Sequence, residues 1–213
     1  DSSTSRGLGD VYKRQMYNLW NNEANNYDSN SRFLARLNIT LASHNCSPDS
    51  MKKVLATIAN HYGYDRIDII TIHPDRTFSV PYEWCQKTVT PLKNNTKTSC
   101  FYAKELEDQL NTLGYIYIQT PEEIHSPELK AYLQAYNTAD LLMLPLFSRY
   151  LFSFIAFSHC STPVSTDIKT IPHLEMLADM IATNMEKNLT IQKLFFRLLQ
   201  TAKISSTPIY NRF

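Results

Sequence analysis

Two apolar runs in the second half of the chain, Leu141 to Phe147 and Leu151 to Ser158, restrict its fold more than any other feature. Only Ser148-Arg149-Tyr150 separates them. Two runs of this length joined by so short a turn predict an antiparallel pair of strands. Pro145 argues on general grounds against a central strand, because proline cannot donate a hydrogen bond to a neighbouring strand.

The segments before this pair predict two helices and a β-hairpin. Asn30 can cap a helix whose apolar residues recur at spacings of three and four. Ser47 is a suitable N-cap for a second helix, which Gly63 would end. The β-branched run Ile67 to Ile72 predicts a strand, and Thr77 to Cys85 predicts its hairpin partner. We expect four residues of the second strand to share one alternating face, namely Phe78, Val80, Tyr82 and Trp84.

The remaining segments complete an α+β pattern. Apolar spacing predicts helices over Phe101 to Leu113 and Pro127 to Tyr136, with a short strand at Tyr115 to Ile118 between them. A long amphipathic helix runs from Leu174 through Leu198, about 40 Å at 1.5 Å per residue. Helices packed on a central, mostly antiparallel sheet are therefore the predicted architecture, with the long helix leaving at the C-terminal end.

Composition excludes several classes of function. Hydrophobic residues make up 43% and charged residues 19% of the chain, and the formal net charge is +1, so we expect no nucleic-acid partner. The longest apolar run is too short to span a membrane, and no secretory leader opens the sequence, so a cytoplasmic location without membrane insertion is expected. The four cysteines, Cys46, Cys85, Cys100 and Cys160, form no CxxC pair, and no metal site or cofactor is expected.

The N-terminal fifteen residues do not read as natural protein. Asp10 to Gln15 can be read back as GAT-GTG-TAT-AAG-AGA-CAG, which resembles the transposase mosaic end of sequencing libraries. We therefore predict an adapter translation at residues 1–15 of a bacterial metagenomic fragment, and a disordered lead-in at 16–29. The folded domain is expected at 30–190, followed at 191–213 by a signalling-helix extension and a truncated tail.

Four stretches resemble the GAF family. They are the helix-to-strand segment Ser47 to Cys85, the Tyr82-Glu83-Trp84-Cys85 stretch within it, the apolar strand Leu141 to Leu146, and Phe154 to Phe157 with the helix after it. Their order and spacing match the family over about residues 30–190. The likeness overrides the objection to Pro145. The chain departs from the family at Ser153, Ala156 and Ser158, where glycine or aspartate is common in family members.

The resemblance implies a non-catalytic sensory domain that binds a small molecule between its sheet and the covering helices. It implies a homodimer formed through terminal helices, and a signal passed along the last helix to an output domain absent from this chain, a histidine kinase or a diguanylate cyclase. The expected ligand-binding residues are Trp84, Tyr102, Leu110, Tyr117, Tyr132, Tyr136 and Met143.

Three alternatives stay open at this point. The seven residues can simply fill a core. A small branch of the GAF fold reduces free methionine sulfoxide through cysteine thiols, for which Cys85 and Cys100 are the candidates here. The domain can also be a ligand-free dimerisation spacer. On the last helix, Leu177, Ile181, Ile191, Phe195 and Leu198 roughly fit a heptad seam that Asn184 and Asn188 interrupt. The other interpretation is a helix packed on its own sheet, which is favoured for Leu174 to Met185, with a dimer seam favoured beyond Asn188.

Overall fold

A five-stranded antiparallel sheet forms the centre of the molecule. Its strands are β1 (Arg66–Ile72), β2 (Phe78–Cys85), β3 (Ile116–Ile118), β4 (Asp140–Phe147) and β5 (Phe152–His159). They lie in the order β2-β1-β5-β4-β3, and every neighbouring pair is antiparallel. The predicted pairing of the two apolar runs is confirmed, with Leu142 opposite Phe157 and Leu146 opposite Ser153.

The structure is a computed structural model that describes residues 29–43, 46–73, 75, 77–92, 104–147, 152–164 and 166–205. The chain divides into two units, residues 1–40 and 41–213. The helix predicted from Asn30 is present over residues 29–43. The predictions for residues 1–28 and for the turn at Ser148 to Tyr150 lie outside the described residues.

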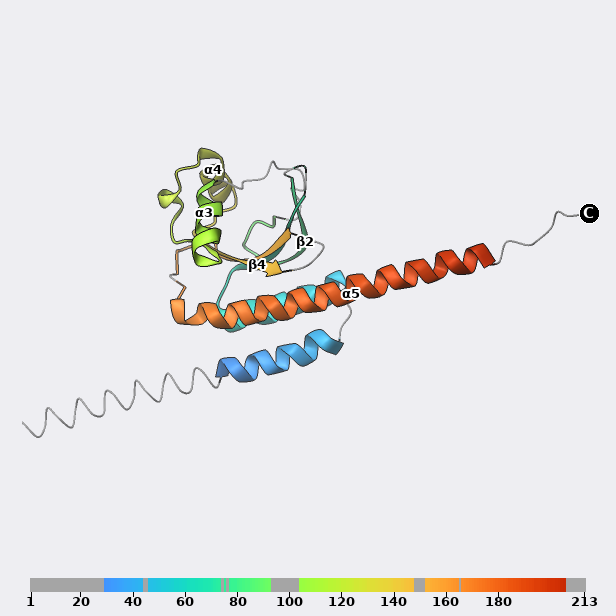
Figure 1. Cartoon of the computed structure of the whole chain (residues 1–213). Coiled ribbons are helices and arrows are strands. Elements are labelled where there is room, and N and C mark those ends of the chain that lie inside the picture. Colours follow the sequence, from blue (N-terminus) through green and yellow to red (C-terminus); the bar gives the residue numbers. More distant parts are fainter. Residues whose placement is uncertain are drawn as a thin grey trace, which may run out of the picture. The chain divides into compact units, whose positions relative to one another are not determined.

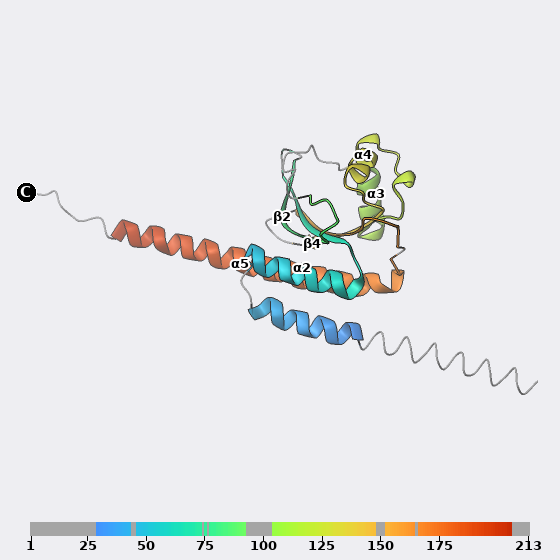
Figure 2. The same ribbon diagram turned by 180° about the vertical axis from the view of Figure 1, so that it is seen from behind.

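Helices cover both faces of the sheet (Figures 1 and 2). On one face, α2 (Pro48–Tyr62) and α5 (Ile171–Ser205) lie side by side in both views. On the other face lie α3 (Lys104–Leu113) and α4 (Pro127–Ala135), joined through β3 and the short 3₁₀ helix η1 (Pro121–Glu123). A second 3₁₀ helix, η2 (Ile168–Thr170), leads into α5. The predicted α+β class and antiparallel sheet are confirmed.

Pro145 is accommodated because of the short length of β3. The residue lies in β4 opposite Phe154 of β5. On the other side of β4, β3 pairs only with Leu141, Leu142 and Met143. Pro145 therefore lies beyond the last residue of β4 that pairs with β3. At this position its missing N–H costs no hydrogen bond to β3.

The prediction that four residues of β2 share one face is wrong, because the strand contains a β-bulge. Tyr82 pairs with Ile69, whereas Ser79 pairs with Thr71, so β2 has one residue more than β1 between these pairs. The extra residue reverses the alternation. Phe78 and Val80 enter the core cluster under α3 and α4, and Trp84 lies opposite Ile67 on the α2 and α5 face.

The ends of α2 follow the predicted capping chemistry. The Ser47 side chain accepts a hydrogen bond from the backbone N–H of Ser50, and Pro48 begins the helix. Gly63 ends it in the left-handed region, at φ 85°, and its N–H donates to Ala59 O at 2.8 Å.

Replacing Gly63 by alanine should lower the free energy of unfolding by about 1–2 kcal/mol, because an L-residue is strained in the left-handed region. A Cβ at this position meets nothing within 4 Å, so steric clash adds no cost. Urea unfolding measures the loss. Gly63→Asn should lose less, since asparagine tolerates this conformation better. An alanine variant as stable as the wild type would contradict the left-handed cap.

Helix α5 is attached to the sheet only along its first half. Its 35 residues span about 52 Å, and Leu174, Leu177 and Ile181 are fully buried. No side chain described between residues 183 and 198 is buried. Among the helices that the structure describes, none has an apolar stretch long enough to cross a membrane, α5 included.

Asn184 and Asn188, which are predicted to interrupt a dimer seam, both make hydrogen bonds within the chain. Asn184 Nδ2 donates to the backbone oxygen of Leu41 at 2.6 Å, and Asn188 Nδ2 contacts Cys46 Sγ at 3.1 Å. Both amides therefore bind α5 to its own chain just after Ala182, the last buried residue described on the helix.

Candidate functional site

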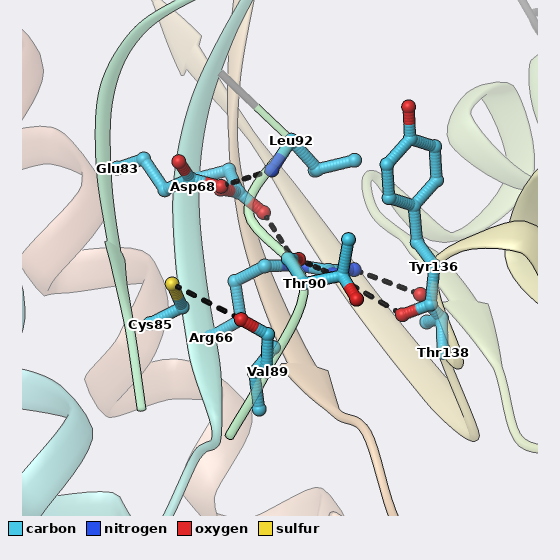
Figure 3. A network of polar contacts seen from close by, with 9 residues as sticks. All are labelled: Arg66, Asp68, Glu83, Cys85, Val89, Thr90, Leu92, Tyr136 and Thr138. Carbon is cyan, nitrogen blue, oxygen red and sulfur yellow. Dashed lines mark hydrogen bonds and ion pairs between the residues drawn. The ribbon is translucent and has the colours of Figure 1, made fainter. Parts of the chain in front are cut away.

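A buried guanidinium on β1 organises the end of the sheet that faces α4 (Figure 3). Arg66 is only 1% exposed, although arginine is almost never buried unless it is paired. It alternates with Ile67 along β1, so its side chain points towards the α3 and α4 layer while Ile67 points towards α2 and α5. The position of Arg66 at the first residue of the strand brings it close to two loops.

Arg66 donates hydrogen bonds to two segments that are distant in sequence, and to Asp68 on its own strand. Nη1 donates to the backbone oxygens of Thr90 and Tyr136, both at 3.3 Å, and Nη2 donates to Thr138 Oγ1 at 2.8 Å. Nε donates to Asp68 Oδ2 at 3.1 Å. The guanidinium carbon lies 6.0 Å from the centre of the Tyr136 ring, within the range of a cation–π contact. One side chain thus ties together β1, the loop after β2 and the end of α4.

Two carboxylates face each other beside this guanidinium. Asp68 on β1 lies directly opposite Glu83 on β2. Glu83 accepts a hydrogen bond from the backbone N–H of Leu92, whereas Asp68 Oδ1 has no hydrogen-bond partner among the described residues. Like charges directly opposite each other in a sheet are unfavourable.

Burial and the neighbouring charges shift the pKa values of both Asp68 and Arg66. Complete burial raises the pKa of Asp68 well above its usual range, and the charge of Glu83 adds to the rise, while Arg66 acts to lower it. For Arg66, burial acts to lower the pKa and the Asp68 carboxylate outweighs it, so the guanidinium stays charged. The carboxyl group of Asp68, rather than the guanidinium, is therefore the one of the two whose charge changes at a pH above the usual range of an aspartate.

The contribution of Asp68 to the free energy of unfolding should fall as pH rises. A raised pKa means that the folded protein binds more protons than the unfolded chain between the two pKa values, so stability decreases as pH rises through that window. Relative to Asp68→Asn, which does not titrate, the wild type should lose up to about 1.4 kcal/mol per pH unit above about pH 4. Urea unfolding of both proteins between pH 4.5 and 8 measures the difference. The opposite slope would mean that Arg66 dominates and that the pKa of Asp68 is lowered.

The segments bound by Arg66 form walls of a pocket of about 600 Å³. The loop residues Thr88 to Thr90 form one wall, and the segment Leu133 to Ala139 at the end of α4 forms another. Pro121, Glu122, Cys160 and Ser161 complete the lining. Hydroxyl and amide groups predominate, and Glu122 is the charged group among these residues. The pocket therefore suits a small polar molecule.

Four of the seven predicted binding residues lie together in the layer between the sheet and α3 and α4. Tyr132, Tyr136 and Met143 are buried there, and Leu110 packs against them. The space left between the buried Arg66 and this layer is only about 10 Å³, so side chains fill it. Of the four, Tyr136 also lines the larger pocket beside this layer.

Two of the other three predicted residues lie on the opposite face of the sheet. Trp84 lies opposite Ile67 on the α2 and α5 face, and Tyr117, opposite Leu142, lies on the same face. The Tyr117 hydroxyl accepts a hydrogen bond from the backbone N–H of Thr166 at 2.9 Å. Tyr102 lies outside the described residues. A binding role for any of the seven remains a prediction.

The cysteines of the described chain carry protonated thiols at neutral pH. Burial raises the pKa of Cys85, and it raises the pKa of Cys160 to about 11. Since the thiolate is the nucleophile, neither environment activates a cysteine. Cys100 lies outside the described residues.

Sequence reasoning missed Arg66, Asp68 and the pocket beside them. A signal was present, because two opposite charges stand two residues apart at the start of an isoleucine-rich strand. In a strand, residues i and i+2 share a face, so such a pair can form an ion pair within the core. The pocket itself left no signal, because its walls come from four separate segments.

Comparison with solved structures identifies the fold. The chain is similar to the phycoerythrobilin-bound GAF domain of a cyanobacterial phytochrome, with a TM-score of 0.62 and 16% identity over 75% of this chain and 95% of that one. It is also similar to the chromophore-binding domain of RpBphP3, an unusual bacteriophytochrome from R. palustris, with a TM-score of 0.65 and 12% identity over 78% of this chain and 63% of that one. A phycocyanobilin-bound GAF domain from a cyanobacterial phytochrome matches with a TM-score of 0.58 and 16% identity. No protein-family model matches the sequence, and a search of curated proteins finds no match.

These structures define the class of the fold as α+β. The chain has the fold of a GAF domain.

Proposed function

We propose that this chain is a non-catalytic sensory GAF domain that binds a small polar molecule in the pocket beside Tyr136. The observation that carries the proposal is the Arg66 clamp. A single buried guanidinium holds Thr90, Tyr136 and Thr138, which come from two parts of the pocket wall, in fixed positions. A pre-organised wall lowers the entropic cost of binding.

The similar solved structures support a small-molecule function, since their GAF domains hold bilin chromophores. We do not extend the bilin to this chain. The pocket beside Arg66, in the layer between the sheet and α3 and α4, has a volume of only about 10 Å³. Cys160 follows His159, the reverse of the Cys-His order often found at bilin attachment sites, and its raised pKa makes it a poor nucleophile.

A thermal-shift screen of polar metabolites tests the proposal, with two alanine-to-phenylalanine variants as matched partners. Ala139 lines the pocket, and a phenylalanine there would fill it. Ala131 is exposed on α4 outside the lining, so Ala131→Phe adds the same ring elsewhere. A ligand at 100 times its Kd should raise the Tm of the wild type and of Ala131→Phe by about 5–10 °C, and leave Ala139→Phe unchanged.

The outcomes separate the alternatives. No shift with any compound, together with a dimer that depends on concentration, would favour the ligand-free spacer. Reduction of methionine sulfoxide that Cys85→Ser or Cys100→Ser abolishes would favour the enzyme. An equal shift in all three proteins would place the ligand outside this pocket.

We further propose that α5 relays binding to an output domain, a histidine kinase or diguanylate cyclase, of a longer parent protein through a homodimer. Its distal half exposes five large apolar side chains, Ile191, Leu194, Phe195, Phe196 and Leu198, each 52–68% exposed. Residues 191, 195 and 198 recur at spacings of four and three, as in a helical seam. Sedimentation equilibrium should give a dimer that Phe195→Glu weakens at least tenfold, roughly 1.4 kcal/mol. A monomer at all concentrations would refute this part of the proposal and leave the pocket unaffected.

A further inference from the structure

A second pocket lies on the opposite face of the sheet, where α5 leaves it. Its volume is about 220 Å³, and it is bounded by β1, β2 and the α5 segment from Met185 to Gln192. Cys46, just before α2, forms its remaining wall. It shares no lining residue with the pocket beside Tyr136.

The lining of this α5 pocket is neutral and partly apolar. Pro81, Met185 and Leu189 supply apolar surface, while Ser79 and Asn188 supply a hydroxyl and an amide. None of the nine described residues that line it carries an acidic or basic side chain. A charged ligand would lose its hydration there without gaining a counter-charge, so the lining selects a neutral one.

The volume of the α5 pocket further restricts the size of the ligand it can hold. A dry cavity of about 150 Å³ lined by apolar side chains binds benzene, whereas drug-sized ligands occupy about 300–1,000 Å³. A volume of about 220 Å³ lies between these limits. The thioether of Met185 favours an aromatic ring, because sulfur and ring edges attract each other.

The polar wall of the pocket is already fixed in place. Asn188 Nδ2 contacts Cys46 Sγ at 3.1 Å and Asn184 O at 2.8 Å. Tyr82 donates its hydroxyl proton to Cys46 O at 3.0 Å, and Ser79 Oγ bonds His73 Nε2 at 2.9 Å. These bonds hold the donors and acceptors around the apolar floor before any ligand arrives, which reduces the ordering cost.

A ligand in the α5 pocket would lie where α5 makes its last contacts with the sheet domain. Ala182 is the last buried residue described on α5, and residues 190–198 are exposed. The pocket residues Met185, Asn188 and Leu189 therefore belong to the final contacts between α5 and the sheet domain. A molecule in the pocket adds contacts between β2 and α5 at this point.

We infer that the α5 pocket binds a small neutral aromatic molecule with one hydrogen-bonding group, of the phenol or indole type, and that this molecule pins the outgoing half of α5 to the sheet. This site shares no residue with the pocket proposed for the polar ligand, so either proposal can be correct if the other fails. The ligand binds only the arrangement of α5 that closes the pocket. This difference in affinity between the two arrangements shifts the helix towards the closed one.

Protection of Cys46 from alkylation tests the inference on the full chain. Phenol and indole are titrated separately, and N-ethylmaleimide labelling of each cysteine peptide is followed by mass spectrometry. Cys85, which is likewise half-buried but does not line this pocket, is the internal control. At ten times the Kd, alkylation of Cys46 should slow about tenfold, since only the unoccupied fraction reacts, while Cys85 is unchanged.

Three tryptophan variants give the specificity control. Leu189→Trp and Gln192→Trp fill the pocket from α5, the second from an exposed position that the fold does not need. Leu194→Trp adds the same ring at a 54% exposed position outside the lining. Saturable protection that both filled variants lose and Leu194→Trp keeps is the expected result.

Each other outcome overturns the inference. No saturable protection of Cys46 at millimolar phenol or indole means that the pocket does not bind this class. Protection that survives in Gln192→Trp but disappears in Ala139→Phe means that the aromatic occupies the pocket beside Tyr136. Protection that rises with protein concentration alone means that a second copy of the chain covers Cys46.

Discussion

Replacing Arg66 by methionine should lower the free energy of unfolding by about 3–5 kcal/mol, the cost of removing one partner of a buried ion pair. The variant leaves Asp68 fully buried beside Glu83 without its counter-charge. It also removes the donors to Thr90 O, Tyr136 O and Thr138 Oγ1. Urea unfolding at pH 7 measures the loss.

Two companion variants identify the cause of this loss. Arg66→Met combined with Asp68→Leu should recover part of the stability, because an apolar pair of similar volume often replaces a buried ion pair at little cost. Lys53→Met, at an exposed position on α2, should change stability by less than about 0.5 kcal/mol. A loss below about 1 kcal/mol in Arg66→Met would show that the guanidinium is solvated rather than buried.

Truncating Leu177 to alanine should cost about 2–5 kcal/mol, the range for a leucine removed from a packed core. Leu177 is 0% exposed, on the face of α5 that covers the sheet beside Leu174 and Ile181. The same measurement applied to Leu194→Ala is the matched control, since Leu194 lies on the same helix but is 54% exposed. That change should stay within about 0.5 kcal/mol.

Equal losses in Leu177→Ala and Leu194→Ala would contradict the division of α5 into a packed half and a free half. A loss near zero in Leu177→Ala would place that face of the helix in water. Retention of the dimer in Leu177→Ala would further separate packing on the sheet from any seam formed beyond residue 190.

The elements of the fold could be predicted because their signals are local. Ser47 and Gly63 mark the ends of α2 through their own backbone chemistry, and the apolar runs on either side of Ser148 define β4 and β5. The resemblance to GAF domains rested on the order of these segments, and the solved structures confirm that fold.

The face of the sheet on which each β2 residue lies was harder to predict, because the one extra residue of a β-bulge moves the residues after it to the opposite face. The bulge between Tyr82 and Ser79 depends on how β2 meets β1, and the sequence of β2 read as a regular alternation. The error placed Trp84 in the same group as Tyr132 and Met143, although the register places it on the other side of the sheet.

The candidate site depends on contacts between distant segments. Arg66 reaches residues 24, 70 and 72 positions away, and none of these contacts follows from the periodicity of β1. The intrachain partners of Asn184 and Asn188 could not be predicted for the same reason, since a polar residue on a helix gives no indication of whether its partner is Cys46 of the same chain or a second helix.

The most direct test of the account is hydrogen exchange of the full chain, with and without the metabolite that gives the largest thermal shift. The proposed sensory role predicts slower exchange at residues 86–92 and 133–139 around the pocket, together with a change in exchange along residues 183–205 of α5. Neither effect should occur in Ala139→Phe. Protection confined to other segments, or protection at the pocket with α5 unchanged, would contradict the claim that this domain binds a small molecule there and relays its presence along the helix.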